Sequence, residues 1–88
     1  MSAIAQKILI SIVYNGTEKS LEVEPLETIH SVLARAIALF RIIDPQHLLA
    51  LFDASDNHAL EPESESVSDA QVKPGARLVL RVSAAKGG

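Results

Sequence analysis

The sequence predicts an α+β fold in which a mixed β-sheet packs on one central helix, with the elements in the order β-β-α-β-β-β. Three observations predict it: a hairpin signal near the start, one amphipathic helical stripe in the middle, and a strictly alternating strand near the end. One helix lying across one sheet is an economical way to bury the apolar side of both. The length of 88 residues corresponds to one small domain.

The chain opens with two strands joined by a tight turn. Residues 7–14 are rich in β-branched side chains, and residues 18–24 alternate between polar and apolar. Asn15 and Gly16 lie between these runs, and the pair is a strong hairpin signal because both residues tolerate positive φ angles. We therefore expect a β-hairpin whose second strand ends at Pro25.

The next segment has the period of an α-helix. Apolar side chains recur on one face at Ile29, Val32, Leu33, Ala36, Ile37 and Phe40. Thr28 precedes this stripe as the expected N-cap, and Glu27 places a negative charge near the positive end of the helix dipole. Arg41 is expected in the last turn. Asp44-Pro45 is expected to end the helix, because the residue before a proline disfavours the α conformation.

The second half of the chain is predicted to be mostly β. Residues 46–52 are expected to form a third strand, and residues 58–60 a short fourth strand. Residues 77–82 alternate strictly and are expected to form the last strand, at the centre of the sheet beside the first. One face of that strand carries Arg77, Val79 and Arg81.

The composition excludes several classes of function. The chain has no cysteine, which excludes disulfides, a thiolate nucleophile and cysteine-based metal centres. Its net charge of −3 does not support non-specific binding to nucleic acid. The three histidines have no metal-ligand spacing, and no catalytic motif occurs. We therefore expect a protein that is not an enzyme, with no catalytic residue, no metal ligand and no bound cofactor.

No membrane partner is expected either. The apolar run at residues 8–14 is far below the roughly 20 residues needed to span a bilayer. The N-terminal residues do not have the pattern of a secretory signal. The cytoplasm is therefore the expected location.

Four short stretches, taken in order, resemble ubiquitin and the ubiquitin-like modifiers of the β-grasp fold. Residues 27–32 resemble the start of the ubiquitin helix, and residues 68–72 (Ser-Asp-Ala-Gln-Val) resemble the stretch before its last strand. Residues 78–81 repeat a Leu-Val-Leu-Arg run of that strand, and the chain ends in Gly87-Gly88 as mature modifiers do. The resemblance divides the chain into an extension (1–6), a ubiquitin-like β-grasp domain (7–82) and a flexible tail (83–88).

The resemblance implies a function for the C-terminal diglycine. In this family an ATP-dependent activating enzyme adenylates the terminal carboxylate, here that of Gly88, and a conjugating enzyme passes the acyl group to a target amine. Glycine suits Gly87 and Gly88 because a chain without Cβ can thread a narrow channel. Residues 83–88 would reach at most ~20 Å when extended. ATP would be used by the partner enzyme and not bound by this chain.

The tail differs from that of ubiquitin, which runs Leu-Arg-Leu-Arg-Gly-Gly. Here residues 83–88 read Ser-Ala-Ala-Lys-Gly-Gly, with no leucine and one basic residue. The chain is therefore more similar to the divergent modifiers of bacterial operons, which are encoded beside activating enzymes, conjugating enzymes and JAB-type isopeptidases. Members of that group are implicated in defence against phage.

The residues expected to recognise these enzymes lie on the last strand and the tail. From residue 73 to the end the chain carries four basic residues and no acidic one, a pattern that favours docking to an acidic groove. Arg77, Arg81 and Lys86 are the candidates. Ubiquitin also uses apolar residues exposed on its sheet, and Val79 and Leu49 are the candidates here. Residues 48–52 are all apolar, so their alternation does not decide whether Leu49 is exposed or belongs to the core.

Two alternative functions remain open. A sulfur carrier has the same fold and the same ending, and its Gly88 would become a thiocarboxylate. A non-covalent interaction domain would bind partners through its surface, and its diglycine would be incidental. Conversion of Gly88 distinguishes the first alternative, and activity after removal of Gly87 and Gly88 distinguishes the second.

Overall fold

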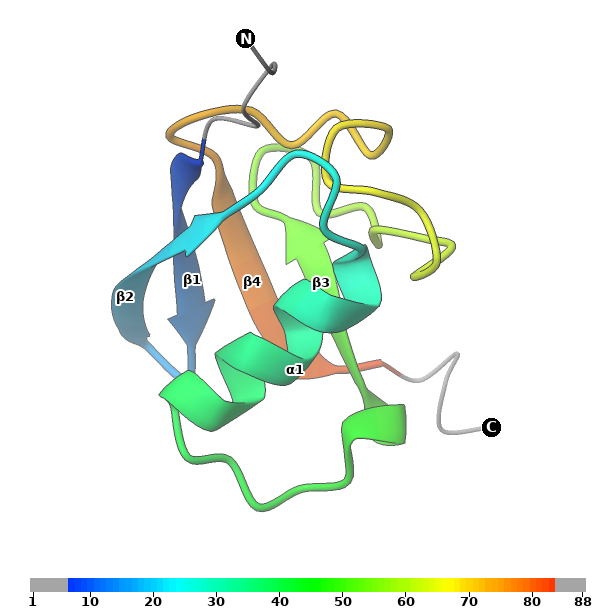
Figure 1. The fold of residues 1–88 in the computed structure, drawn as a ribbon. Helices are drawn as coiled ribbons and strands as arrows, with labels where there is room; N and C mark the ends of the chain where they lie inside the picture. The colour runs from blue at the N-terminus through cyan, green and yellow to red at the C-terminus, as the bar shows by residue number, and fades with distance from the viewer. Residues whose placement is uncertain (1–6, 84–88) are drawn as a thin grey trace, which may run out of the picture.

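Alternating strands and one helical stripe produce a mixed four-stranded sheet crossed on one face by a single helix (Figure 1). The computed structural model describes residues 7–83. The elements in chain order are β1 (Ile8–Tyr14), β2 (Thr17–Val23), α1 (Ile29–Leu39), the 3₁₀ helix η1 (Gln46–Leu48), β3 (Leu49–Asp53) and β4 (Arg77–Val82). Within residues 7–83 no helix is long and apolar enough to cross a membrane.

The strands lie in the order β2-β1-β4-β3. β1 pairs antiparallel with β2 and parallel with β4, and β3 completes the sheet antiparallel to β4. The predicted position of the last strand, beside the first at the centre of the sheet, is confirmed. The predicted hairpin is also confirmed: Asn15 and Gly16 have φ angles of 51° and 83°, as a two-residue turn with the right twist requires.

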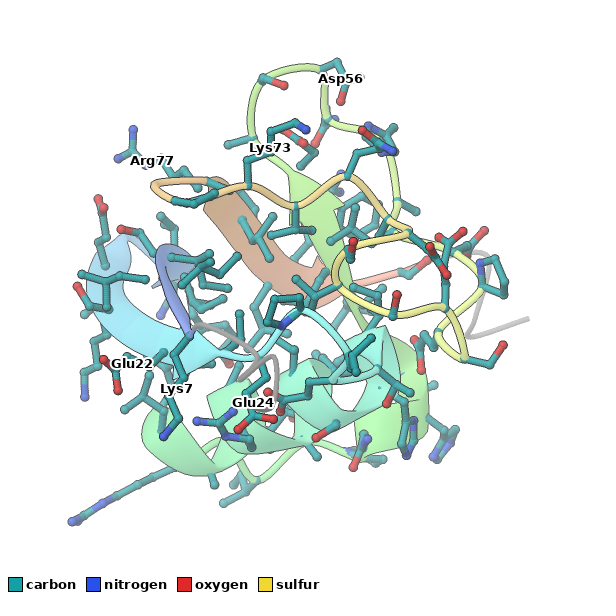
Figure 2. The ribbon with its side chains drawn as sticks, turned by 45° about the horizontal axis from the view of Figure 1, so that its top comes forward. Lys7, Glu22, Glu24, Asp56, Lys73 and Arg77 are labelled. Carbon is teal, nitrogen blue, oxygen red and sulfur yellow. The ribbon has the colours of Figure 1, made fainter. Side chains whose placement is uncertain are left out.

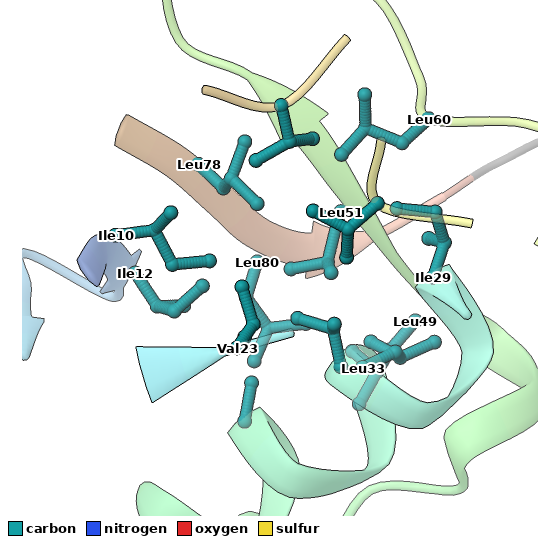
Figure 3. Packing of buried hydrophobic residues seen from close by; sticks show 14 residues of the cluster. Ile10, Ile12, Val23, Ile29, Leu33, Leu49, Leu51, Leu60, Leu78 and Leu80 are labelled. Carbon is teal, nitrogen blue, oxygen red and sulfur yellow. The ribbon is translucent and has the colours of Figure 1, made fainter. Parts of the chain in front are cut away.

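The core lies between the sheet and the helix (Figure 3). In β1, β3 and β4, every second side chain points toward α1. These side chains are Ile10, Ile12, Leu49, Leu51, Leu78 and Leu80. The helical stripe meets them through Ile29, Val32, Leu33 and Ala36, which are all buried. Ile37 and Phe40 are partly buried and pack against the same cluster. Non-polar area removed from water in this layer is the main favourable term in folding.

The helix begins as predicted but ends earlier. Thr28 Oγ1 accepts a hydrogen bond from the Ser31 amide at 3.1 Å, which confirms Thr28 as the N-cap. The helix ends at Leu39, so the prediction that Arg41 lies in its last turn and that Asp44-Pro45 stops it is wrong. Arg41 adopts a left-handed φ of 55°, and the amides of residues 41 and 42 turn back to the carbonyls of residues 38 and 37. These two bonds form a Schellman motif, which ends a helix by its backbone geometry.

Two predicted strands are shorter than expected. Residues 46–48 form η1, where the Leu48 amide donates to the Pro45 carbonyl, and β3 begins only at Leu49. The expected strand at 58–60 is reduced to one β-bridge between Ala59 and Phe52. A ladder cannot continue far from that bridge, because Pro62 lacks an amide hydrogen.

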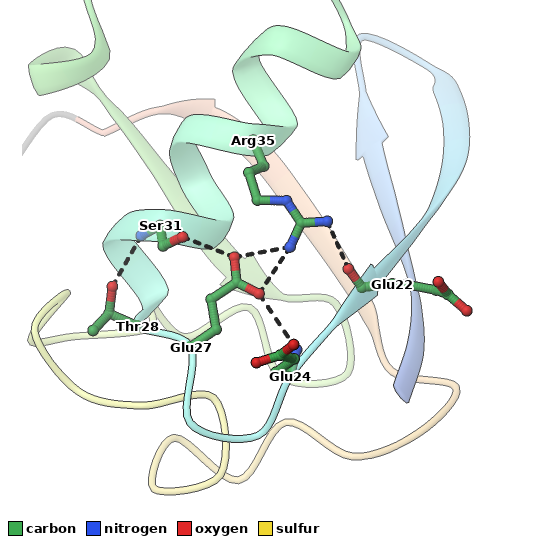
Figure 4. A network of polar contacts seen from close by, with 6 residues as sticks. All are labelled: Glu22, Glu24, Glu27, Thr28, Ser31 and Arg35. Carbon is green, nitrogen blue, oxygen red and sulfur yellow. Dashed lines mark hydrogen bonds and ion pairs between the residues drawn. The ribbon is translucent and has the colours of Figure 1, made fainter. Parts of the chain in front are cut away.

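Glu27 ties the start of the helix to the edge of the sheet (Figure 4). Arg35 Nη1 donates to both of its carboxylate oxygens, at 2.8 and 2.9 Å, and Ser31 Oγ donates at 2.8 Å. Arg35 Nη2 also donates to the Glu22 carbonyl of β2 at 2.8 Å. Burial raises the pKa of the Glu27 carboxyl, whereas its hydrogen bonds and the guanidinium charge lower that pKa by more. The pKa of Glu27 therefore lies below its ordinary value of 4.5.

We expect Glu27→Gln to lower the free energy of unfolding at neutral pH by about 1–2 kcal/mol, because the amide removes a charge-assisted acceptor. A depressed pKa in the folded state contributes stability that is complete above 4.5 and is lost as the pH falls through the folded value. The unchanged protein should therefore lose stability more steeply in acid than Glu27→Gln does. Urea denaturation across this pH range measures both effects.

Glu22→Gln is the matched control, because the Glu22 carboxylate points away from the network (Figure 4). Its pH profile should follow that of the unchanged protein. Parallel acid profiles for Glu27→Gln and the unchanged protein would contradict the assigned role of Glu27.

Candidate functional site

Three of the candidate recognition residues, Arg77, Val79 and Arg81, lie on the outer face, by which we mean the side of the sheet opposite α1. Three residues from neighbouring strands form an apolar row across it, since Val13 pairs with Val79 and Val79 pairs with Phe52. Arg77 and Arg81 flank Val79 on β4, so the strand presents a basic, apolar, basic order on this face. The alternation predicted for this strand is confirmed for residues 77–81, and Val79 is half-buried. Val82, which the alternation places on the same side as Leu78 and Leu80, is instead 56% exposed.

Arg77 reaches across the outer face toward β2. Its Nη2 donates to Glu18 Oε1 at 3.0 Å, and both side chains are largely exposed, so the pair contributes little to stability. Arg77 also lines an open pocket of about 510 Å³, together with Lys73, at the end of the sheet where the chain enters β4 (Figure 2). The two basic side chains therefore lie at one end of β4, and Asp53 lines the same pocket.

Arg81 is held at the other end of β4. Its guanidinium lies over the Phe52 ring, 3.8 Å from the ring centroid, and its Nη2 donates to Asn57 Oδ1 at 2.9 Å. Phe52 faces away from the helix and yet is only 8% exposed. Arg81 is therefore engaged within the domain, a role that the sequence did not indicate.

Leu49 is placed in the core, and its assignment to an exposed recognition surface is wrong. Its side chain is 0% exposed and belongs to the buried cluster beneath α1. The alternation of β3 sends Leu49 and Leu51 inward and leaves Ala50 and Phe52 on the outer face. The apolar position on β3 beside Val79 is thus Phe52, which the sequence could not distinguish in an all-apolar strand.

The C-terminal candidates Lys86, Gly87 and Gly88 lie outside the described residues. Ser83, which the sequence assigns to the tail, is 6% exposed, and its amide donates to the Leu48 carbonyl at 2.9 Å. The folded domain therefore extends one residue beyond β4, through Ser83.

One group of metal-ligand types occurs in the described part of the chain. A ligand atom from each of Asp53, Asp56 and His58 lies within 4.8 Å of the others in the turn after β3. A close contact between His58 Nδ1 and Asp56 raises the pKa of His58 and lowers that of Asp56. Asp56 and His58 are exposed, and Asp53 is partly buried. The spacing of the histidines in the sequence did not indicate this group, because two of its three residues are aspartates.

Comparison with known proteins gives the fold. No protein-family model matches the sequence, and no curated protein matches it. Among solved structures, a ubiquitin-like domain from Arabidopsis thaliana matches with a TM-score of 0.77 at 15% identity, over 92% of this chain and 82% of that one. Ubiquitin from Caldiarchaeum subterraneum matches with a TM-score of 0.74 at 25% identity, over 89% of this chain and 95% of that one.

A designed protein based on ubiquitin also matches, with a TM-score of 0.74 at 20% identity over 89% of this chain and 90% of that one. Together with the mixed sheet and single helix described above, these likenesses show that the chain has the α+β ubiquitin-like β-grasp fold.

The different environments of Leu49 and Val79 lead to a test by substitution. Leu49→Ala leaves a cavity beneath α1 and should lower the free energy of unfolding by about 2–5 kcal/mol. Val79→Ala removes less buried area on the outer face and should cost less than about 1.5 kcal/mol. Thermal and urea denaturation of the two variants measure the difference, and equal losses would contradict the assigned faces.

Proposed function

We propose that the chain is a ubiquitin-like protein modifier whose Gly88 carboxylate is adenylated by an activating enzyme and then conjugated to target amines. The observation that carries this proposal is the joining of a ubiquitin-like fold to a C-terminal Gly87-Gly88. Proteins of this fold are typically modifiers or domains and not enzymes.

The chemistry places the reaction at one atom of this chain. A carboxylate oxygen of Gly88 attacks the α-phosphorus of ATP, and pyrophosphate leaves. The acyl-adenylate then reacts with an enzyme nucleophile, and AMP leaves. An acceptor amine finally takes the acyl group and releases the enzyme. Glycine at 87 and 88 favours these steps because it lets the chain enter a narrow channel.

The outer face supports the proposal as a docking surface. Arg77, beside Lys73, offers positive charge at one end of β4, and Val79 offers an apolar contact between the two arginines. Arg77, Val79 and Lys86 are therefore the proposed contacts with the activating and conjugating enzymes. We further propose cytoplasmic conjugation in a bacterial antiphage pathway, with a JAB-type isopeptidase removing the modifier.

Intact-protein mass spectrometry tests the proposal. The full chain, incubated with its activating enzyme and ATP, should form an acyl-adenylate or a covalent enzyme adduct. Deletion of Gly88 should abolish the adduct, because the new terminal carboxylate sits one residue short. Arg77→Gln should weaken adduct formation by several fold while leaving it detectable, because it removes one of several charges.

Three outcomes would contradict the proposal. Equal adduct formation after deletion of Gly88 would exclude the carboxylate of that residue. A mass gain of one oxygen-to-sulfur exchange would instead identify a sulfur carrier. Full biological activity without Gly87 and Gly88 would identify a non-covalent interaction domain.

A further inference from the structure

Two arginines on the same face of β4 have different surroundings. Arg77 forms an exposed ion pair with Glu18 of β2. Arg81 makes no ion pair with a described carboxylate, but its guanidinium lies over the Phe52 ring and also donates to Asn57. These contacts join β4 to the neighbouring strand and to the turn that follows it. Near the end of β4, the Arg81 side chain therefore connects the outer face of this strand to β3 and to the turn after β3.

The backbone after Arg81 is also held. Val82 pairs with Leu49 at the start of β3, and the amide of Ser83 donates to the Leu48 carbonyl at 2.9 Å. Ser83 is the one polar residue among those described that is buried, at 6% exposed. The described chain is therefore held on the sheet through Ser83, two residues beyond Arg81.

A strand separates from its sheet beginning at its free end, where each step breaks few contacts. Opening of Val82 and Ser83 breaks the hydrogen bond from the Ser83 amide to the Leu48 carbonyl and exposes Ser83, but it leaves the side-chain contacts of Arg81 in place. Opening one residue further must also lift the Arg81 guanidinium from Phe52 and break its bond to Asn57. The side-chain contacts of Arg81 thus oppose the separation of β4 from β3 at residue 81, in addition to the backbone pairing there.

We propose that Arg81 is a positioning residue, which stops the separation of β4 and so fixes where the chain leaves the sheet. Phe52 and Asn57 are its two anchors. This assignment replaces direct enzyme contact as the main role of Arg81. It makes the departure point depend on residues of β3 and its following turn, none of which belongs to the C-terminal segment.

This inference gains its functional meaning from the proposed function. With the chain held through Ser83, residues 84–88 can reach at most about 17 Å, at about 3.4 Å per extended residue. If β4 opened through Arg81, the segment that carries Gly88 would be longer, but the position at which it is attached to the sheet would vary. A fixed departure point lowers the entropy cost of placing Gly88 in an enzyme channel.

Amide hydrogen exchange of the full chain, measured by NMR, tests the anchor without any partner enzyme. Phe52→Leu and Asn57→Gly each remove one anchor and keep the Arg81 charge, and glycine preserves the positive φ of 61° at position 57. Relative to the Ile12 amide, the amide of Arg81 should exchange about two- to fivefold faster in each variant, whereas the amide of Ser83, which opens before the anchor is reached, should change little. Using Ile12 as the reference corrects for any loss of global stability.

Arg77→Gln is the matched control for exchange, because it removes the ion pair at the other end of the same strand face. It should leave the relative exchange of Arg81 and Ser83 unchanged. Unchanged exchange of the Arg81 amide in both anchor variants, or an equal increase in Arg77→Gln, would overturn the inference.

Kinetics with the activating enzyme separate positioning from direct contact. If Arg81 positions the chain, Phe52→Leu and Arg81→Gln should both lower kcat of adenylation without raising KM, and the double variant should be no worse than either. A raised KM in Arg81→Gln, with normal kinetics in Phe52→Leu, would overturn the positioning role. Absence of any adduct with the unchanged chain would refute the proposed function, and the exchange result would still decide the anchor.

Discussion

The parallel pairing of β1 with β4 is the interaction on which the rest of this structure depends. It joins Ser11 to Arg77 and Val13 to Val79, positions that are far apart in the chain, so its closure carries a large entropic cost. Burial of Ile12 and Leu78 beneath α1 offsets that cost. Because β4 lies at the centre, both of its edges pair with neighbouring strands, β1 on one side and β3 on the other.

Two arginines secure opposite edges of the sheet by different physics. Arg35 binds a carboxylate that is only 12% exposed and also a backbone carbonyl of β2, so water competes weakly for these bonds. Arg81 has no carboxylate partner in the described part of the chain and relies on the face of Phe52. The third described arginine with a partner, Arg77, forms an exposed pair that water screens. Arg77 is therefore the one whose charge is most accessible to a docking protein.

Sequence patterns predicted the fold where a local signal was present. Turn and capping chemistry identified the hairpin at Asn15-Gly16 and the N-cap at Thr28, and alternation of polar and apolar residues identified β4. The end of α1 was not recognisable, because Arg41, a residue without strong turn preference, takes the left-handed conformation that usually falls to glycine. The polar residues at 46 and 47 likewise did not indicate that the chain forms η1 before β3 begins.

The sequence by itself determined the opening hairpin, the single helix after it, the last strand with its inward-facing Leu78 and Leu80, and the glycines at positions 87 and 88. These are local properties, since periodicity, turn chemistry and residue identity need no distant partner. Only the tertiary structure decided that Leu49 is buried, that Phe52 occupies the outer face, and that Arg81 lies on it. Those outcomes depend on which strand neighbours β3 and in which register, and an all-apolar run of residues contains no periodic signal for either.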